Sequence, residues 1–367
     1  MEFRYSRWDE RLTQNLNFLR NILALYHRLL LMTDGNVDQA LRALEELGDR
    51  FGFFNEKFTL EDFKKQLREK DAIQEVNGRN VLTKTGERMI RKDSLDRIFG
   101  DLAKDSAGEH RVPRTGVGGD RITETRPYVF GDSVSDIDFL SSVRNSMRRQ
   151  RGEWSEEGLS LNEDDLEVFE TEHLSSCATA LLIDVSHSMI LYGEDRITPA
   201  KQAALALAEL ILTRYPKDSL SVVLFGDDAW EVKIRDIPYV SVGPYHTNTK
   251  AGLQLAQKIL AREKHVNKQI FMITDGKPSA IFENGRFYKN AFGLDPRIVN
   301  KTLDEAVACR RKRIPITTFM VTQDPYLVRF VERFTQLNKG RAYFSDLENL
   351  GSYLFVDFAR NRKRRLQ

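Results

Sequence analysis

Five oxygen-bearing side chains follow predicted strands or precede a predicted helix, and together they have the chemistry of a divalent-cation site. Asp184, Ser186 and Ser188 come after the apolar run ATALLI. Thr247 lies in GPYHTNTKAGL, just before a predicted helix, and Asp275 comes after the run IFMI. Hard oxygen ligands of this kind suit Mg²⁺, Mn²⁺ or Ca²⁺ and argue against zinc or copper. A cation would neutralise Asp184 and Asp275, whose burial at a sheet edge is otherwise costly.

Each of these acids and hydroxyls, taken alone, is typical of a turn or a helix cap, and only their combination predicts a metal site. Alternation along an extended chain turns His187 away from the ligands and predicts that it packs in the interior. Thr249 either supports the site or caps the helix that follows. Asp227 and Asp228, after the run LSVVLFG, favour an exposed turn.

Apolar strands and helices alternate after Leu166, and these are the elements that must position the candidate ligands. The predicted strands are LEVFETE, ATALLID, LSVVLFG, QIFMITD, ITTFMVT and RAYFSD. Helical stretches such as TPAKQAALALAELILTRY lie between them, with Thr198 and Pro199 as the expected helix start. This pattern predicts a doubly wound α/β domain with a mostly parallel sheet. Ligands of such sheets bind beyond the carboxyl ends of the strands.

The candidate site resembles the metal-ion-dependent adhesion site (MIDAS) of von Willebrand factor A (VWA) domains. The residues that carry the resemblance are Asp184-x-Ser186-x-Ser188, Thr247 in TNTxxGL, and Thr274-Asp275-Gly276. The resemblance covers about Leu166 to the carboxyl terminus and implies a Rossmann-like VWA domain. It implies that the three hydroxyl groups bind the ion and that the aspartates bind it directly or through water. It also implies that a carboxylate from a partner protein completes the coordination shell.

Three further segments resemble bacterial cytosolic VWA proteins that typically work with AAA+ ATPases of the MoxR or metal-chelatase type. They are TRPYVFGD, DLEVFETE and DPYLVRFVERFTQLNKGRAYF. The resemblance implies an adaptor that binds such an ATPase or its client. The pair would act in chaperone-like protein remodelling or in metal-cofactor insertion.

Residues 1–104 are predicted to form a mainly α-helical domain. RLTQNLNFLRNILALYHRLLLM, NVDQALRALEEL and TLEDFKKQLREK place apolar residues three and four apart, and Thr59 with Asp62 is a capping signal. The pair Asn77-Gly78 between short extended runs predicts a hairpin with a type I′ turn. Helices, a hairpin and the further helix SLDRIFGDL together suggest a winged-helix-like arrangement.

Residues 105–165 are rich in Gly, Arg and turn formers, and we expect a linker or irregular extension there. Its end, SSVRNSMRRQRGEW, predicts a short basic helix. The third predicted domain, the VWA domain, is then residues 166–367.

The composition of the 367-residue chain excludes several classes of protein. It is 41% hydrophobic and 30% charged with a formal net charge of +2, which fits a globular protein without long-range attraction to nucleic acid. The only cysteines, Cys177 and Cys309, are expected to be buried thiols. The charged amino terminus lacks the apolar core of a signal peptide, and no apolar run approaches the ~20 residues of a membrane helix. We therefore expect a cytoplasmic protein without a membrane partner.

The leading functional hypothesis is a non-enzymatic, divalent-metal-dependent protein-binding module. A metal-dependent hydrolase or phosphotransferase is the alternative, because Mg²⁺ beside Asp184 can serve phosphoryl chemistry. Against it, no second acid stands two residues after Asp184, and the sequence has neither a Gly-x-Ser-x-Gly elbow nor a phosphate loop. A third hypothesis is nucleic-acid binding through the helical domain and the basic tail RNRKRRLQ. The small net charge and the acids of the helix TLEDFKKQLREK count against it.

Overall fold

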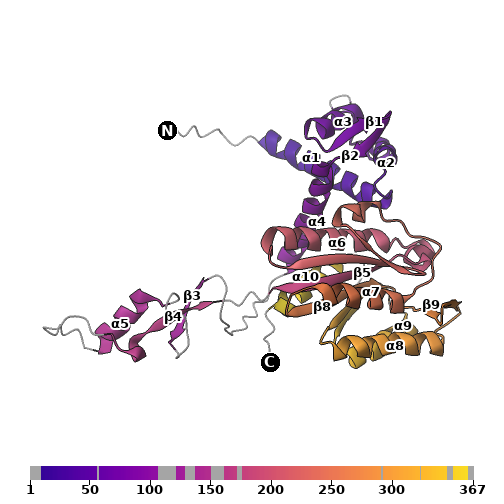
Figure 1. The fold of residues 1–367 in the computed structure, drawn as a ribbon. Helices are drawn as coiled ribbons and strands as arrows, with labels where there is room; N and C mark the ends of the chain where they lie inside the picture. Colours follow the sequence, from indigo (N-terminus) through magenta and orange to yellow (C-terminus); the bar gives the residue numbers. More distant parts are fainter. Residues whose placement is uncertain are drawn as a thin grey trace. The chain divides into compact units, whose positions relative to one another are not determined.

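The computed structural model divides the chain into two compact units, which we call the main unit and the small unit (Figure 1). The main unit combines Met1–Ser106 with Cys177–Phe358, and the small unit combines Ala107–Ser176 with Ala359–Gln367. The structure describes residues 10–55, 58–105, 121–128, 137–149, 161–171, 176–290, 292–322, 324–344 and 350–362.

A six-stranded sheet in the order β12-β11-β8-β5-β6-β7 forms the centre of the main unit in the described part of the chain. Five strands are parallel, and β7 pairs antiparallel with β6 at one edge. The strands are β5 (Cys177–Asp184), β6 (Ser219–Phe225), β7 (Ala229–Val232), β8 (Asn267–Thr274), β11 (Ile316–Met320) and β12 (Arg341–Phe344). This confirms the predicted doubly wound α/β fold with a mostly parallel sheet.

Helices cover both faces of the sheet because the side chains of each strand alternate between two apolar cores. On β5, Leu181 and Ile183 belong to the core that includes α6 and α10, whereas Ala180 and Leu182 belong to the core of α7, α8 and α9. The helices are α6 (Ile197–Arg214), α7 (Thr249–Arg262), α8 (Pro296–Arg311), α9 (Pro325–Asn338) and α10 (Leu350–Arg362). The end of the basic tail, residues 363–367, lies outside the described residues.

Short elements connect the sheet with these helices. The hairpin of β9 (Ala280–Glu283) and β10 (Arg286–Lys289) follows β8, and in Figure 1 β9 lies at the edge of the domain. Two 3₁₀ helices, η3 (His187–Gly193) and η4 (Ile234–Tyr239), follow β5 and β7. Sequence analysis did not predict β7, β9 or β10.

The amino-terminal part of the main unit has the predicted order of helices, hairpin and helix. Its elements are α1 (Glu10–Met32), α2 (Val37–Phe51), α3 (Leu60–Glu69), β1 (Ile73–Val76), β2 (Arg79–Leu82) and α4 (Lys84–Asp105). Thr59 and Asp62 form the predicted capping box. Asn77 and Gly78 have φ values of 52° and 73° between the paired strands, as a type I′ turn requires.

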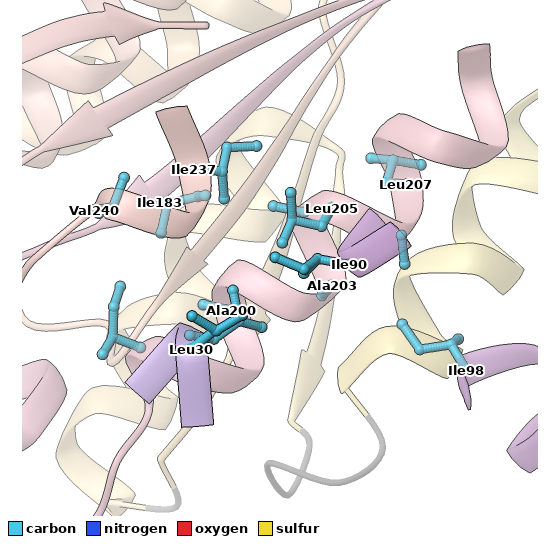
Figure 2. Close-up of a cluster of buried hydrophobic side chains, with 14 of the residues drawn as sticks. Leu30, Ile90, Ile98, Ile183, Ala200, Ala203, Leu205, Leu207, Ile237 and Val240 are labelled. Atoms are coloured by element: carbon cyan, nitrogen blue, oxygen red, sulfur yellow. The ribbon is translucent and has the colours of Figure 1, made fainter. Parts of the chain in front are cut away.

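These amino-terminal helices pack on α6, so that α6 is buried between them and the sheet. Figure 2 shows Leu30 of α1 and Ile90 of α4 in one cluster with Ala200 and Ala203 of α6. Such two-sided burial explains why the stretch ALALAELI of α6 is apolar on nearly all sides, with Glu209 as its one charged residue.

Two ion pairs join the same elements. Lys201 of α6 is fully buried, and its Nζ lies 2.6 Å from Oδ1 of Asp34 and 2.9 Å from the carbonyl oxygen of Leu31. Arg91 Nε of α4 lies 3.1 Å from Oε2 of Glu209 in α6. Helices α1 and α4 and the turn that follows α1 are therefore held to the sheet domain by polar contacts as well as by apolar packing.

The small unit contains the one predicted strand that does not join the parallel sheet. LEVFETE includes β4 (Glu167–Thr171), which pairs antiparallel with β3 (Arg121–Pro127). Its partner segment is charged and gave no strand signal, so the sequence did not reveal the pairing. The basic helix is α5 (Phe139–Arg149), and Arg149 binds the carboxylate of Asp165 at 2.8 Å. The boundary predicted between residues 165 and 166 falls within this unit.

Within the described residues, none of the helices combines the length and apolarity needed to cross a bilayer.

Candidate metal centre

The three predicted hydroxyl ligands form one cluster beyond the carboxyl end of β5. Ser186 Oγ lies 3.1 Å from Ser188 Oγ and 2.9 Å from Thr247 Oγ1. Ligands 2.0–2.1 Å from Mg²⁺ and at right angles to each other are about 2.9 Å apart. In the structure these distances are hydrogen bonds between the hydroxyl groups, and the same spacing fits adjacent positions around one octahedral cation.

Asp184 is the last residue of β5 and is completely buried. Its Oδ1 accepts a hydrogen bond from the Ser186 N–H at 2.9 Å, and its Oδ2 accepts one from Thr274 Oγ1 at 2.6 Å. Burial, and then the negative charge of Asp275, hold the pKa of Asp184 above its usual range. A cation beside this carboxylate pair would offset both effects.

Asp275 follows β8, the neighbour of β5 in the sheet, and only 3% of it is exposed. Its Oδ1 accepts a hydrogen bond from the Lys277 N–H at 3.2 Å. Gly276, between them, has a φ of 89°, a conformation that favours glycine. This turn places the second carboxylate at the same sheet edge as the first.

Most of the candidate metal ligands are hydroxyl oxygens rather than carboxylates, imidazoles or thiolates. The described residues include no group of three or more His, Cys, Asp or Glu side chains that could hold a metal. Two carboxylates and three hydroxyls would suit a hard cation, and metal binding by these residues stays a prediction.

Two residues that the sequence did not single out fix the loop of Thr247. Asn248 caps α7 by accepting a hydrogen bond from the Ala251 N–H at 3.0 Å, and its own N–H donates to the carbonyl of Gly226. Ser279 Oγ accepts from the Thr247 N–H at 2.9 Å. The suggested capping role of Thr249 is therefore wrong, because Thr249 is the first residue of α7.

The expectation that His187 packs in the interior is also wrong, because His187 is exposed. The strand ends at Asp184 and η3 begins at His187, so the alternation on which the prediction depended stops there. Asp228 is exposed as expected. Asp227 instead accepts a hydrogen bond from the His246 N–H at 2.7 Å and so supports the loop of Thr247.

The predicted start of α6 is only approximately right. The helix begins at Ile197, and Asp195 Oδ1 accepts the hydrogen bond from the Thr198 N–H at 3.0 Å. The Thr198 hydroxyl is buried without a hydrogen-bond partner among the described residues, so it does not cap the helix.

Comparison with known proteins identifies the domain that carries this site. Residues 177–359 match the family described as "Rv0959-like protein, vWA domain". The chain contains a von Willebrand factor A domain. Residues 120–171 match the description "Rv0959-like protein, third domain", which covers β3, α5 and β4. The β3–β4 sheet is therefore part of a separate domain and not of the vWA sheet.

Two mycobacterial relatives have the same degree of similarity. "Uncharacterized protein Rv0959" of Mycobacterium tuberculosis (strain ATCC 25618 / H37Rv) and "Uncharacterized protein Mb0984" of Mycobacterium bovis are each 31% identical over 273 residues. The alignment covers 72% of this chain and 40% of each relative. The chain thus spans about two fifths of the length of the curated relatives that it matches.

Among solved structures, the vWF domain of the type V pili tip protein Mfa5 from Porphyromonas gingivalis is 14% identical with a TM-score of 0.42, covering 53% of this chain and 98% of that one. The PilB minor pilin from Streptococcus sanguinis is 14% identical with a TM-score of 0.40, covering 57% of this chain and 66% of that one. Likenesses at this level support no statement about function.

Proposed function

We propose that this vWA domain is a non-enzymatic binding module whose divalent cation is completed by an acidic residue of a partner protein. The domain belongs to a type of protein-interaction module. The ligands in this proposal are Asp184, Ser186, Ser188, Thr247 and Asp275. The observation that carries it is the hydroxyl cluster, whose oxygens lie 2.9 and 3.1 Å apart beside a buried carboxylate.

The chemistry of this donor set explains why the partner would supply an acid. Two carboxylates at most balance the charge of the ion, and the three hydroxyls add none. A carboxylate is then a strong further ligand, since hard cations prefer anionic oxygen. We propose Mg²⁺ as the ion, and Mn²⁺ or Ca²⁺ would accept the same oxygens.

We further propose that the partner is an AAA+ ATPase of the MoxR type or its client, and that the chain acts as an adaptor in protein remodelling or metal-cofactor insertion. This step is supported by the resemblance of TRPYVFGD, DLEVFETE and the segment from Asp324 to Phe344 to such VWA proteins. A cytoplasmic location stays a prediction. No observation on the described residues favours the hydrolase or nucleic-acid alternatives.

Titration of the full chain with Mg²⁺ in a calorimeter tests the metal site. Thr247→Val removes one hydroxyl ligand, and we expect it to weaken Mg²⁺ binding at least about ten-fold, which corresponds to about 1.4 kcal/mol. Thr318→Val is the matched control, because Thr318 is also buried and its hydroxyl has no hydrogen-bond partner among the described residues. Absence of Mg²⁺ binding, or equal affinity in both variants, contradicts the proposed site.

Affinity capture from a bacterial cell extract tests the partner. We expect the wild-type chain to retain an AAA+ ATPase in Mg²⁺ but not in EDTA, and Thr247→Val to lose it. Equal recovery in EDTA would mean that the cation does not mediate the contact. Recovery of no AAA+ ATPase would contradict the adaptor role while leaving the metal site to the calorimetric test.

A further inference from the structure

A band of aromatic side chains, all exposed except the half-buried His246, borders the candidate metal centre. Trp230 and Tyr245 have 38% and 37% of their surface exposed, and their ring centroids are 6.1 Å apart. The rings of His246 and Phe287 contact each other edge to face, with their centroids 6.1 Å apart. Phe287 pairs across the β9–β10 hairpin with Phe282, and their ring centroids are 5.1 Å apart. We call these five residues the aromatic band.

The band is held by the same loops that hold the candidate ligands. The carbonyl oxygen of Tyr245 accepts a hydrogen bond from the His187 N–H at 3.0 Å, next to Ser186. His246 directly precedes Thr247. The carbonyl oxygen of Thr247 accepts hydrogen bonds from the N–H groups of Ser279 and Ala280, where the hairpin begins. The aromatic surface and the hydroxyl cluster therefore have a fixed relation in the fold.

The hairpin also carries positive charge. Arg286 and Lys289 lie on β10 and are exposed. Lys250 of α7 donates from its Nζ to the carbonyl oxygen of Phe282 at 3.1 Å. Glu283, the acid of β9, contacts both Arg297 and Lys301. An acidic partner segment is complementary to the charge of the hairpin, whereas Asp227 contacts His246 within the band.

We propose that the aromatic band and the β9–β10 hairpin select the partner, which is a protein segment with a cation-binding Asp or Glu close to bulky apolar side chains and further acids. The inference rests on the proposed function, because the first acid of the segment is the one that completes the cation. Phe282 and Phe287, exposed by 42% and 37%, are costly to leave in water and are suited to cover apolar side chains of a partner. Aromatic residues at such surfaces commonly dominate binding energy.

The probe for this inference is a displayed library of random 12-residue peptides with one fixed central Asp, selected on the full chain in Mg²⁺. We expect the selected peptides to be enriched in Phe, Trp, Leu or Ile near the Asp and in further acids. A selected peptide is then synthesised with a fluorescent label, and its affinity is measured by polarisation in Mg²⁺ and in EDTA.

The decisive variant is Phe282→Ser combined with Phe287→Ser. We expect it to bind the peptide about ten-fold more weakly, a typical effect of removing interface aromatics, with its Mg²⁺ affinity unchanged. Val266→Ser is the control, because Val266 is 74% exposed. It directly precedes the first residue of β8, whereas the candidate metal centre lies beyond the carboxyl ends of the strands. It should bind the peptide like the wild type.

The possible results separate this inference from the proposed function. If EDTA and Thr247→Val abolish binding but the Phe282/Phe287 variant binds normally, the aromatic band does not select the partner and the metal-dependent module stands. If the peptides bind equally in EDTA, the proposed function fails and this inference fails with it. A library that yields no Mg²⁺-dependent binder also overturns the inference, since it contains the proposed chemistry.

Discussion

Replacing Asp34 with Asn tests how the amino-terminal helices are joined to the vWA domain. The ammonium group of Lys201 is fully buried, 2.6 Å from Asp34 and 2.9 Å from the Leu31 carbonyl. Asp34 has a φ of 50°, which Asn also tolerates, so the substitution removes the negative charge without straining the turn. It leaves the buried ammonium group with neutral hydrogen-bond acceptors and with the charge of Asp195, which forms no ion pair with it among the described contacts.

The expected loss lies between two limits. Removing one partner of a fully buried ion pair costs about 3–5 kcal/mol, whereas a hydrogen bond to a charged group is worth about 1.5–3 kcal/mol. The Asp34 side chain is 44% exposed, so water replaces part of the lost interaction. We expect Asp34→Asn to lower the free energy of unfolding by about 2 kcal/mol at neutral pH.

The loss should shrink as the pH rises. Burial lowers the pKa of Lys201 in the folded chain, and the hydrogen bond and charge of Asp34 partly offset this. Between that lowered pKa and the unfolded value of about 10.4, the unfolded chain binds more protons at this lysine, so stability increases with pH. Asp34→Asn lowers the pKa of Lys201 in the folded chain further. The unfolding free energy that the variant loses relative to the wild type is therefore largest where Lys201 is charged in both folded proteins, and it declines toward alkaline pH.

Urea unfolding followed by circular dichroism at neutral and alkaline pH measures both effects. Asp236→Asn is the control, because its side chain is 49% exposed and lies 3.5 Å from Arg235, which is 59% exposed. Such a surface pair should contribute less than about 1 kcal/mol. Equal losses in the two variants, or an Asp34→Asn deficit that does not decline with pH, would refute the buried-pair reasoning.

Two other substitutions or treatments test the packing of the main unit. Gly35→Ala should lower the free energy of unfolding in urea by about 2–3 kcal/mol, because the φ of Gly35 is 76° and a Cβ there would lie 2.3 Å from the ring of Tyr239. Gly52→Ala is the control: its φ is 69° but no atom lies near the added Cβ, so it should cost about 1 kcal/mol. Similar costs would show that Tyr239 does not confine the turn. Burial raises the pKa of the Cys309 thiol to about 12, so we expect no reaction of Cys309 with a disulfide reagent at pH 8 until the chain is unfolded. Rapid labelling of Cys309 in the native chain would contradict its burial.

The parallel strands could be predicted because they are buried on both faces. All eight residues of β5 are buried, and its sequence is a nearly continuous apolar run. β9 and β10 lack such a continuous apolar run, since Phe282, Arg286 and Lys289 are exposed. The turn between them is Asn284-Gly285, with φ values of 50° and 74°, which is the same signal as Asn77-Gly78. This hairpin could therefore have been predicted from its turn, although its strands give no burial pattern.

The candidate ligands could be predicted from their types and spacing, but the residues that support them could not. Ser186 and Thr247 are 61 positions apart, and their hydroxyls meet because β5 and the start of α7 share one sheet edge. Asn248 and Ser279 were missed because a polar residue in a loop acquires its role only from the element that packs beside it. The failed expectation for His187 has a similar origin, since strand alternation has no meaning once the strand has ended.

The apolar sequence of α6 is the feature that links the two halves of the main unit. A helix that covers one face of a sheet needs one apolar side, yet Ala203, Leu205 and Leu207 are buried around α6 because α4 and α1 cover its outer side. The vWA match begins at residue 177 and does not include those helices. A fragment of residues 177–359 would therefore expose apolar surface on α6 and leave Lys201 without Asp34. Because α6 follows the loop of Ser186 and Ser188, metal and partner binding should be measured on the full chain, in which the outer side of α6 is covered.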